Sequence, residues 1–268
     1  GRAHYERPVH EVVVLDGAMG TELRRRDVDT GLPLWSANAL ISHPEIVSRI
    51  HMDYLEAGAD ILTTDTFRTT PRSFRNARLP NRSEALTVLA VRLAREAAAA
   101  FPDRSVLVAG SIAPLEDCYR PDLVPSDREL LEEHREHAAR LAREGVDFLL
   151  LETMNTVREA SAACAAARET GKEVVVSFIC RPDGTLYSGE SLTSAVSAVA
   201  PLEPSAFSLN CISPRYLGPI LRRLRDLTPL PIAVYGNVGE PGKEQEEERF
   251  VCDVDEETYT TYAAGWMQ

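Results

Sequence analysis

Ionisable side chains directly follow several of the short apolar runs in this chain. Asp16 follows a run that ends at Leu15, Glu152 follows Leu151, and Cys211 comes one residue after Asn210. An unpaired carboxylate beside apolar residues is costly, and a cationic group relieves that cost. A thiol just before a helix can be a nucleophile or a metal ligand, because the helix N-terminus favours the thiolate. These positions predict an amino-group site at Asp16 and Glu152, and sulfur or metal chemistry at Cys211.

Each of these residues taken alone has a structural alternative. A carboxylate at a strand end can cap a helix or accept backbone N–H groups, and a single cysteine is most often a buried, inert side chain. The functional interpretation gains weight only because two carboxylates stand at the ends of facing strands. The histidines form no metal motif, so we expect surface or packing roles for them.

The remaining cysteines do not predict a disulfide framework, because five cysteines at irregular spacings leave one without a partner. Cys180 lies at a predicted strand end, while Cys118 and Cys252 lie in predicted loops. Cys164 falls in an alanine-rich helical stretch and is expected to belong to the core. We therefore expect the cysteines to be reduced thiols or metal ligands.

Apolar, β-branched runs alternate with longer helical patterns, which is typical of repeated βα units and a parallel sheet. The predicted strands are 12–15, 60–64, 105–109, 147–151, 173–178, 206–209 and 231–235; the predicted helices are 43–57, 83–100, 127–143, 156–169, 192–200, 216–227 and a last one from about 255 to 266. The polar residues at the carboxyl ends of the strands should converge on one opening of the barrel, because active sites of α/β barrels form at those ends.

The expected fold is therefore a (β/α)8 TIM barrel whose eighth βα unit is absent from the sequence, and we expect a further C-terminal segment to supply it. An open doubly wound sheet and a barrel closed by a non-standard element are the alternatives. The stretch 237–255, rich in glycine and glutamate, is expected to be a solvated loop. No linker divides the chain, so residues 1–268 are expected to form one domain.

Composition narrows the function further. The 268 residues carry 41 acidic and 29 basic side chains, a net charge of −12, which argues against a nucleic-acid surface. No apolar run approaches the roughly 20 residues of a membrane helix, and the first residues lack the apolar region of a secretory signal. The sequence predicts a cytoplasmic enzyme that acts on small molecules, without a nucleic-acid or membrane partner; its oligomeric state stays open.

Several segments resemble the homocysteine S-methyltransferase family, in the family's order. They are LDGAMGTEL from Leu15, LWSANAL from Leu34, HPEIVSRIHMDYLEAGADILTTDTF from His43, GSIAPLEDCYRPDLVP from Gly110, GVDFLLLETM from Gly145 and SLNCISP from Ser208. Each piece is modest alone, but the set is specific and covers nearly the whole chain.

The resemblance implies roles for individual residues. Asp16 and Glu152 match the carboxylates that hold the amino group of homocysteine, Gly17 and Thr66 match polar neighbours of the amino acid, and Cys211 matches the first zinc ligand. The family's two other zinc-binding cysteines lie in a GGCCG segment at the eighth strand, and no such segment occurs here. We expect those cysteines in the further C-terminal segment.

The function that the resemblance implies is transfer of a methyl group from an unidentified donor to the Zn2+-bound thiolate of homocysteine, giving methionine. Trp35, Tyr119 and Tyr187 could contact a cationic donor, although ordinary packing explains them equally well. Two alternatives stay open: a metal-independent lyase or isomerase that uses Glu152 as a base, and a non-catalytic amino-acid-binding barrel that lacks the zinc ligands.

Overall fold

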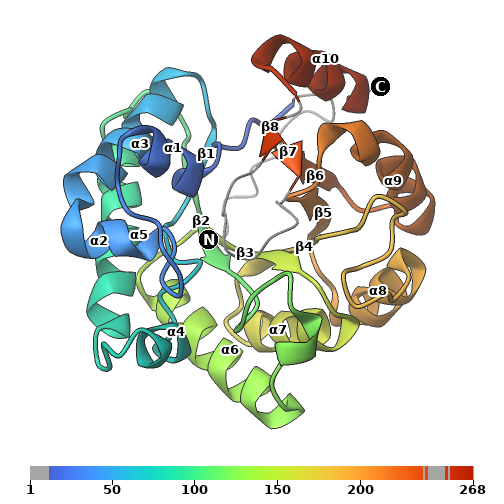
Figure 1. Ribbon diagram of the computed structural model, residues 1–268, viewed down its shortest axis with the longest axis horizontal. Helices are drawn as coiled ribbons and strands as arrows, with labels where there is room; N and C mark the ends of the chain where they lie inside the picture. The colour runs from blue at the N-terminus through green and yellow to red at the C-terminus, as the bar shows by residue number, and fades with distance from the viewer. Residues whose placement is uncertain (1–11, 238, 241–250, 253, 268) are drawn as a thin grey trace, which may run out of the picture.

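A computed structural model describes residues 12–237, 239–240, 251–252 and 254–267. Its main sheet holds six parallel strands in sequence order, so each strand pairs with its neighbour along the chain. They are β1 (Ile61–Thr63), β2 (Leu107–Ile112), β3 (Phe148–Met154), β4 (Glu173–Phe178), β5 (Ala206–Asn210) and β6 (Ile232–Tyr235). The strands follow an arc and the helices lie on its outer side (Figure 1).

The long helices agree with the prediction to within about two residues. They are α3 (Pro44–Glu56), α5 (Ser83–Ala99), α6 (Asp127–Arg143), α7 (Val157–Arg168), α8 (Leu192–Val199), α9 (Pro214–Leu227) and α10 (Glu256–Trp266). The prediction missed three short helices, α1 (Met19–Arg25), α2 (Ala37–Ser42) and α4 (Pro71–Asn76). Helices of six or seven residues are too short to show a helical repeat of apolar positions.

Local signals explain where the long helices begin and end. The Ser126 side chain accepts from the backbone N–H of Glu129, and the Glu129 side chain accepts in return, which forms a capping box at the start of α6. Gly145 follows that helix with φ +84°, a conformation that only glycine adopts without strain. Thr156 caps α7 in a similar way.

The predicted strand 12–15 is wrong except at its last residue. Leu15 forms a single parallel bridge to Ile61, whereas Val12, Val13 and Val14 are 59%, 37% and 48% exposed. The N–H of Val14 binds the Asp60 carboxylate instead of a neighbouring strand. An apolar run predicts a strand only when a core is available to bury it, and these valines have none in the part of the chain described.

The predicted α/β class with a parallel sheet is confirmed as a curled six-stranded sheet. The stretch 237–255 is not wholly a loop, because β7 (Gly239–Glu240) and β8 (Val251–Cys252) pair as antiparallel strands. Residues 241–250 of that stretch, four of which are glutamates, lie outside the described residues.

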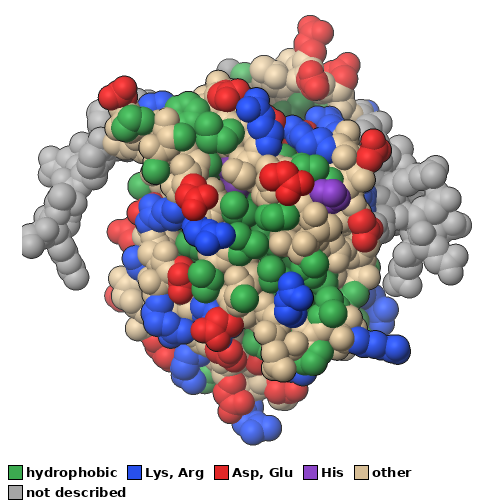
Figure 2. All heavy atoms as spheres, turned by 90° about the vertical axis from the view of Figure 1, so that its left-hand side faces the viewer, with side chains coloured by type: hydrophobic (Ala, Val, Ile, Leu, Met, Phe, Trp, Pro, Cys, Tyr) green, Lys and Arg blue, Asp and Glu red, His purple; other side chains and the backbone are tan. Residues whose placement is uncertain are grey.

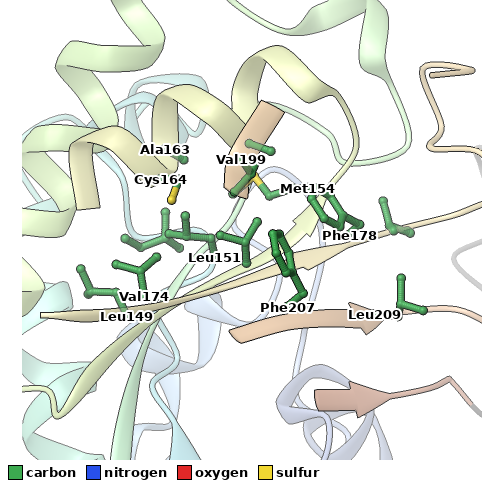
Figure 3. Packing of buried hydrophobic residues seen from close by; sticks show 14 of the residues in the cluster. Leu149, Leu151, Met154, Ala163, Cys164, Val174, Phe178, Val199, Phe207 and Leu209 are labelled. Carbon is green, nitrogen blue, oxygen red and sulfur yellow. The ribbon is translucent and has the colours of Figure 1, made fainter. Parts of the chain in front are cut away.

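Alternate residues of the strands belong to two different layers. Leu149 and Leu151 of β3 and Phe207 and Leu209 of β5 pack with Cys164 of α7 and the other helices in the main core (Figure 3). The intervening apolar residues pack with one another across the inner face of the sheet: Leu15, Ile61, Ala109, Leu150, Val175 and Tyr235. Two residues further towards the carboxyl ends, the same strands carry polar residues on this face; Ser111, Glu152, Ser177 and Asn210 are buried, and Thr63 is partly buried.

The outer surface is charged and mixed. On the face that includes α2 and α3, acidic and basic side chains are interspersed (Figure 2), and pairs such as Arg49 with Asp53 at 2.8 Å join them. Among the described residues, no helix combines the length and the apolar character needed to cross a bilayer.

Candidate active site

Glu152 lies in the polar layer at the carboxyl end of β3 and is buried. Its carboxylate accepts a hydrogen bond from the Ser111 hydroxyl of β2 and one of 3.2 Å from the Tyr235 hydroxyl of β6. Burial raises the pKa of Glu152, and these two hydrogen bonds oppose the rise. The side chain is therefore held by two strands of the sheet, yet no cation among the described residues neutralises it.

Asp16 stands next to the first strand of the sheet, directly after the Leu15 bridge. Its two carboxylate oxygens accept hydrogen bonds from the backbone N–H of Thr63 at 2.7 Å and from the Thr63 hydroxyl at 2.9 Å. Burial, with a smaller contribution from the charge of the nearby Glu152, raises the pKa of Asp16 to about 7 despite these bonds. A pKa in this range places the ionisation of Asp16 close to neutral pH.

Cys211 lies at the carboxyl end of β5 and belongs to the same neighbourhood. Its N–H donates to the Tyr235 carbonyl at 3.2 Å, and the side-chain amide of Asn210 donates to its sulfur at 3.2 Å. Burial raises the pKa of Cys211 to about 12, and the charge of Glu152 contributes to that rise. This direction is opposite to the one expected from the nearby helix N-terminus, because the cost of desolvating the thiolate outweighs a dipole effect.

The predicted trio is thus brought together. Glu152 acts electrostatically on both Asp16 and Cys211, and Tyr235 contacts Glu152 through its hydroxyl and Cys211 through its carbonyl. Two carboxyl groups and a thiol share one polar layer, and no cationic side chain among the described residues neutralises the two carboxylates. A ligand with an ammonium group at one end and a sulfur at the other matches this arrangement.

Gly17 and Thr66 have visible structural duties. A Cβ at Gly17 would lie 2.6 Å from the Tyr54 hydroxyl, so only glycine allows Tyr54 to pack there. Thr66 is fully buried and its hydroxyl donates to the Ser111 carbonyl at 2.7 Å. Thr66 therefore supports the residue that holds Glu152, while contact of Gly17 or Thr66 with a substrate stays a prediction.

The other cysteines and the aromatic candidates lie as follows. Cys118, Cys164 and Cys180 are buried free thiols, and Cys164 belongs to the core as predicted. The guanidinium of Arg24 already lies 4.4 Å from the centre of the Trp35 ring. Tyr119 and Tyr187 pack edge to face with ring centres 5.3 Å apart. Among the described residues, His51, His134 and His137 are buried, which agrees with packing roles.

A metal site is only partly present in the described residues. In the ranges that the structure covers, no group of three or more His, Cys, Asp or Glu side chains is placed to hold an ion. The half-buried sulfur of Cys211 is a suitable single ligand, but a tetrahedral zinc ion needs several. The described residues therefore fit one position of such a site and do not fit a complete one.

The sequence did not reveal the residues that hold the acids. Ser111, Tyr235 and Thr63 each donate to a carboxylate, and Asn210 contacts the sulfur. In the sequence, Ser111 and Tyr235 lie 41 and 83 positions from Glu152, and Thr63 lies 47 positions from Asp16. The only signal was position: Thr63 lies within a predicted strand and Tyr235 closes one, while Asn210 and Ser111 follow the ends of two others by one and two residues.

The raised pKa of Asp16 predicts a pH-dependent stability. Its pKa is about 7 in the folded chain and near 3.8 when unfolded, so the folded state binds more protons between these values. The free energy of unfolding contributed by Asp16 therefore falls as pH rises from 4 to 7 and is flat above. We expect the melting temperature of Asp16→Asn, relative to wild type, to increase between pH 5 and pH 8 by several degrees, since about 1 kcal/mol corresponds to roughly 2–4 °C.

The matched control is Asp122→Asn. Asp122 is exposed and its pKa is lowered by the Arg120 side chain, so its contribution is constant between pH 5 and pH 8. A difference between wild type and Asp16→Asn that is the same at both pH values would show that Asp16 is ionised throughout.

Comparison with known proteins identifies the family. The model of the family "Homocysteine S-methyltransferase" matches residues 13–268. A homocysteine S-methyltransferase of Escherichia coli is 33% identical over 86% of this chain and 79% of its own length. A selenocysteine Se-methyltransferase of Brassica oleracea is 30% identical over 95% of this chain and 81% of its own.

Solved structures agree. The metallated form of the Escherichia coli homocysteine methyltransferase MmuM superposes with a TM-score of 0.78 at 33% identity, covering 85% of this chain and 84% of that one. Its apo form gives a TM-score of 0.71 over 85% and 83% of the two chains. The resemblance seen in the sequence is thus confirmed along nearly the whole chain, and the protein belongs to the homocysteine S-methyltransferase family.

Proposed function

We propose that this chain transfers a methyl group from an unidentified donor to the sulfur of homocysteine, giving methionine. In this reaction a bond forms between the sulfur and the methyl carbon, the bond from that carbon to the donor breaks, and the donor keeps its electron pair. The thiol proton of homocysteine is released. The observation that carries the proposal is the shared polar layer of Asp16, Glu152 and Cys211, in a chain of this family.

The two carboxylates bind the amino group in this proposal. An ammonium between Asp16 and Glu152 supplies the positive charge that the site lacks, and it favours the ionised form of both acids. Thr63 fixes one acid, and Ser111 and Tyr235 fix the other, so little conformational freedom is lost on binding. Gly17 and Thr66 complete the amino-acid pocket.

We propose Zn2+ as the metal, with Cys211 as one ligand. The metallated form of the MmuM structure supports a metal at this kind of site, and thiolates are preferred zinc ligands. When bound, zinc favours the thiolate of a coordinated sulfur at neutral pH. The raised pKa of Cys211 fits this need, because a thiol with so high a pKa ionises at neutral pH only beside a strong positive charge.

We also propose that the curled sheet belongs to a fold of the (β/α)8 TIM-barrel type, and that residues 1–268 form a single domain of it. The strand order, the outer helices and the polar layer at the carboxyl ends of the strands support this architecture. The donor of the methyl group is proposed to be a small molecule, without a more specific assignment.

The test is a methyl-transfer assay with purified, reduced protein. Homocysteine is incubated with methyl-labelled S-methylmethionine, betaine or methyltetrahydrofolate, and labelled methionine is measured by mass spectrometry. We expect product with at least one donor and none with 2-aminobutyrate, which lacks the thiol. Homocysteine binding without product from any donor would favour a binding protein, and sulfur-independent turnover by zinc-free protein would favour the lyase or isomerase.

A further inference from the structure

The side-chain amide of Asn210 joins the carboxyl ends of β3 and β5. Its oxygen accepts from the backbone N–H of Thr153 at 2.9 Å and from the Ser177 hydroxyl at 2.7 Å. Its nitrogen donates to the Thr153 hydroxyl at 3.0 Å and to the Cys211 sulfur at 3.2 Å. These four bonds use the full capacity of an amide in a fully buried side chain, so its orientation is fixed.

The two residues joined by this amide both have strained backbones. Thr153 has φ 62° and Cys211 has φ 56°, and neither is glycine. The left-handed region is unfavourable for such residues and persists where surrounding contacts hold it, often at functional sites. Asn210 supplies contacts of this kind to both. Thr153 directly follows Glu152. The two strained residues and the Asn210 hydrogen bonds that hold them therefore lie beside Glu152 at the amino-group end of the proposed homocysteine site and at Cys211 at its sulfur end.

The amide therefore links the sulfur of Cys211 to the backbone that carries Glu152. A hydrogen bond between the Thr153 side chain and Cys211 closes the same link, and with the bond from Asn210 it opposes the rise in the pKa of Cys211. In homocysteine the amino group and the sulfur are separated by a fixed number of bonds. A site that recognises both ends must hold the group that binds the amino group and the group that binds the sulfur at a matching distance, to within a fraction of an ångström.

We infer that Asn210 is a positioning residue that sets the sulfur of Cys211 relative to Glu152, and thereby makes binding depend on the thiol of the substrate. The inference rests on the proposed function, since it assumes that homocysteine occupies this site. Asn210 touches no reacting atom in this account. It acts through Cys211 and Thr153, and its loss should affect recognition of the thiol more than recognition of the amino group.

The test compares two ligands in the substitution Asn210→Asp. An aspartate has the same shape and still accepts from Thr153 and Ser177, but it loses both N–H donors and places an oxygen beside the sulfur. Calorimetry on the protein with its metal as purified gives Kd for homocysteine and for 2-aminobutyrate. We expect the preference of wild type for homocysteine to fall about tenfold or more, because the hydrogen bond from the amide to the sulfur is lost and a carboxylate oxygen takes the place of the donor.

Two further variants keep the test decisive. Thr153→Val removes only the hydroxyl and should lower the preference in the same direction, so the idea stays testable where Asn210→Asp does not fold. Ser208→Ala is the matched control, because Ser208 is buried on the same strand and its hydroxyl has no hydrogen-bond partner among the described residues. Its preference should equal that of wild type.

The outcomes separate the two claims. If Asn210→Asp and Thr153→Val both keep the wild-type preference, even with lowered melting temperatures, Asn210 has only a structural role. That result would overturn the inference and leave the proposed function standing. A wild-type protein that binds homocysteine no better than 2-aminobutyrate would overturn the proposed function as well.

Discussion

Replacing Cys211 by alanine is expected to remove most of the bound zinc and to lower kcat/KM by about a hundredfold or more. Loss of an outer-shell partner of a metal ligand commonly costs about 10–100-fold in affinity or activity, so loss of a ligand itself should cost at least as much. Metal analysis of freshly purified, reduced protein should give about one zinc per chain for wild type, as a single substrate-binding site requires, and far less for the variant.

The control for this result is Cys164→Ala. Cys164 is another free thiol, but it is fully buried in α7 and packs in the main core. This variant should lose stability and keep its zinc. Full zinc occupancy in Cys211→Ala would remove Cys211 from the metal site and with it the link between the metal and the two acids.

Replacing Glu152 by glutamine is expected to weaken homocysteine binding by roughly 10–150-fold at pH 7.5. The amide has the same size, but it replaces a charged acceptor, and hydrogen bonds to charged groups contribute about 1.5–3 kcal/mol. The loss should appear in Kd for homocysteine and also for 2-aminobutyrate, because the acid binds the amino group that both ligands share. Calorimetry on the two ligands measures it.

Asp65→Asn provides the matched control for the glutamate. Asp65 is another buried carboxyl at the end of β1, and burial raises its pKa to about 6, but it bonds to Ser36 and to none of the three proposed site residues. Its substitution should leave Kd for homocysteine unchanged. Equal losses in both variants would mean that total negative charge, and not the placement of Glu152, attracts the ligand.

The sequence predicted those elements whose pattern is long enough to repeat. Helix α6 was placed to the residue, because Ser126, Glu129 and Gly145 mark both of its ends. The valines before Leu15 misled the prediction, since their exposure depends on which elements surround them and not on their own type. The short helices α1, α2 and α4 depend on packing in a separate core cluster, and no local sequence pattern predicts that packing.

The candidate site was predictable in its acids and its thiol but not in what holds them. Asp16, Glu152 and Cys211 stand at strand ends, and parallel strands bring their ends together. The roles of Ser111, Tyr235 and Asn210 depend on the register between strands and on side-chain rotamers. The raised pKa of Cys211 likewise follows from burial in the folded chain, which outweighs the helix effect that the sequence suggested.

The most direct test is a crystal structure of the metal-loaded protein with homocysteine, using anomalous scattering at the zinc edge to locate the ion. We expect the ammonium of the ligand between the carboxylates of Asp16 and Glu152, and its sulfur about 2.3 Å from a zinc ion that Cys211 also binds. An ammonium held away from both acids, or a metal bound without Cys211, would contradict the site described for this chain.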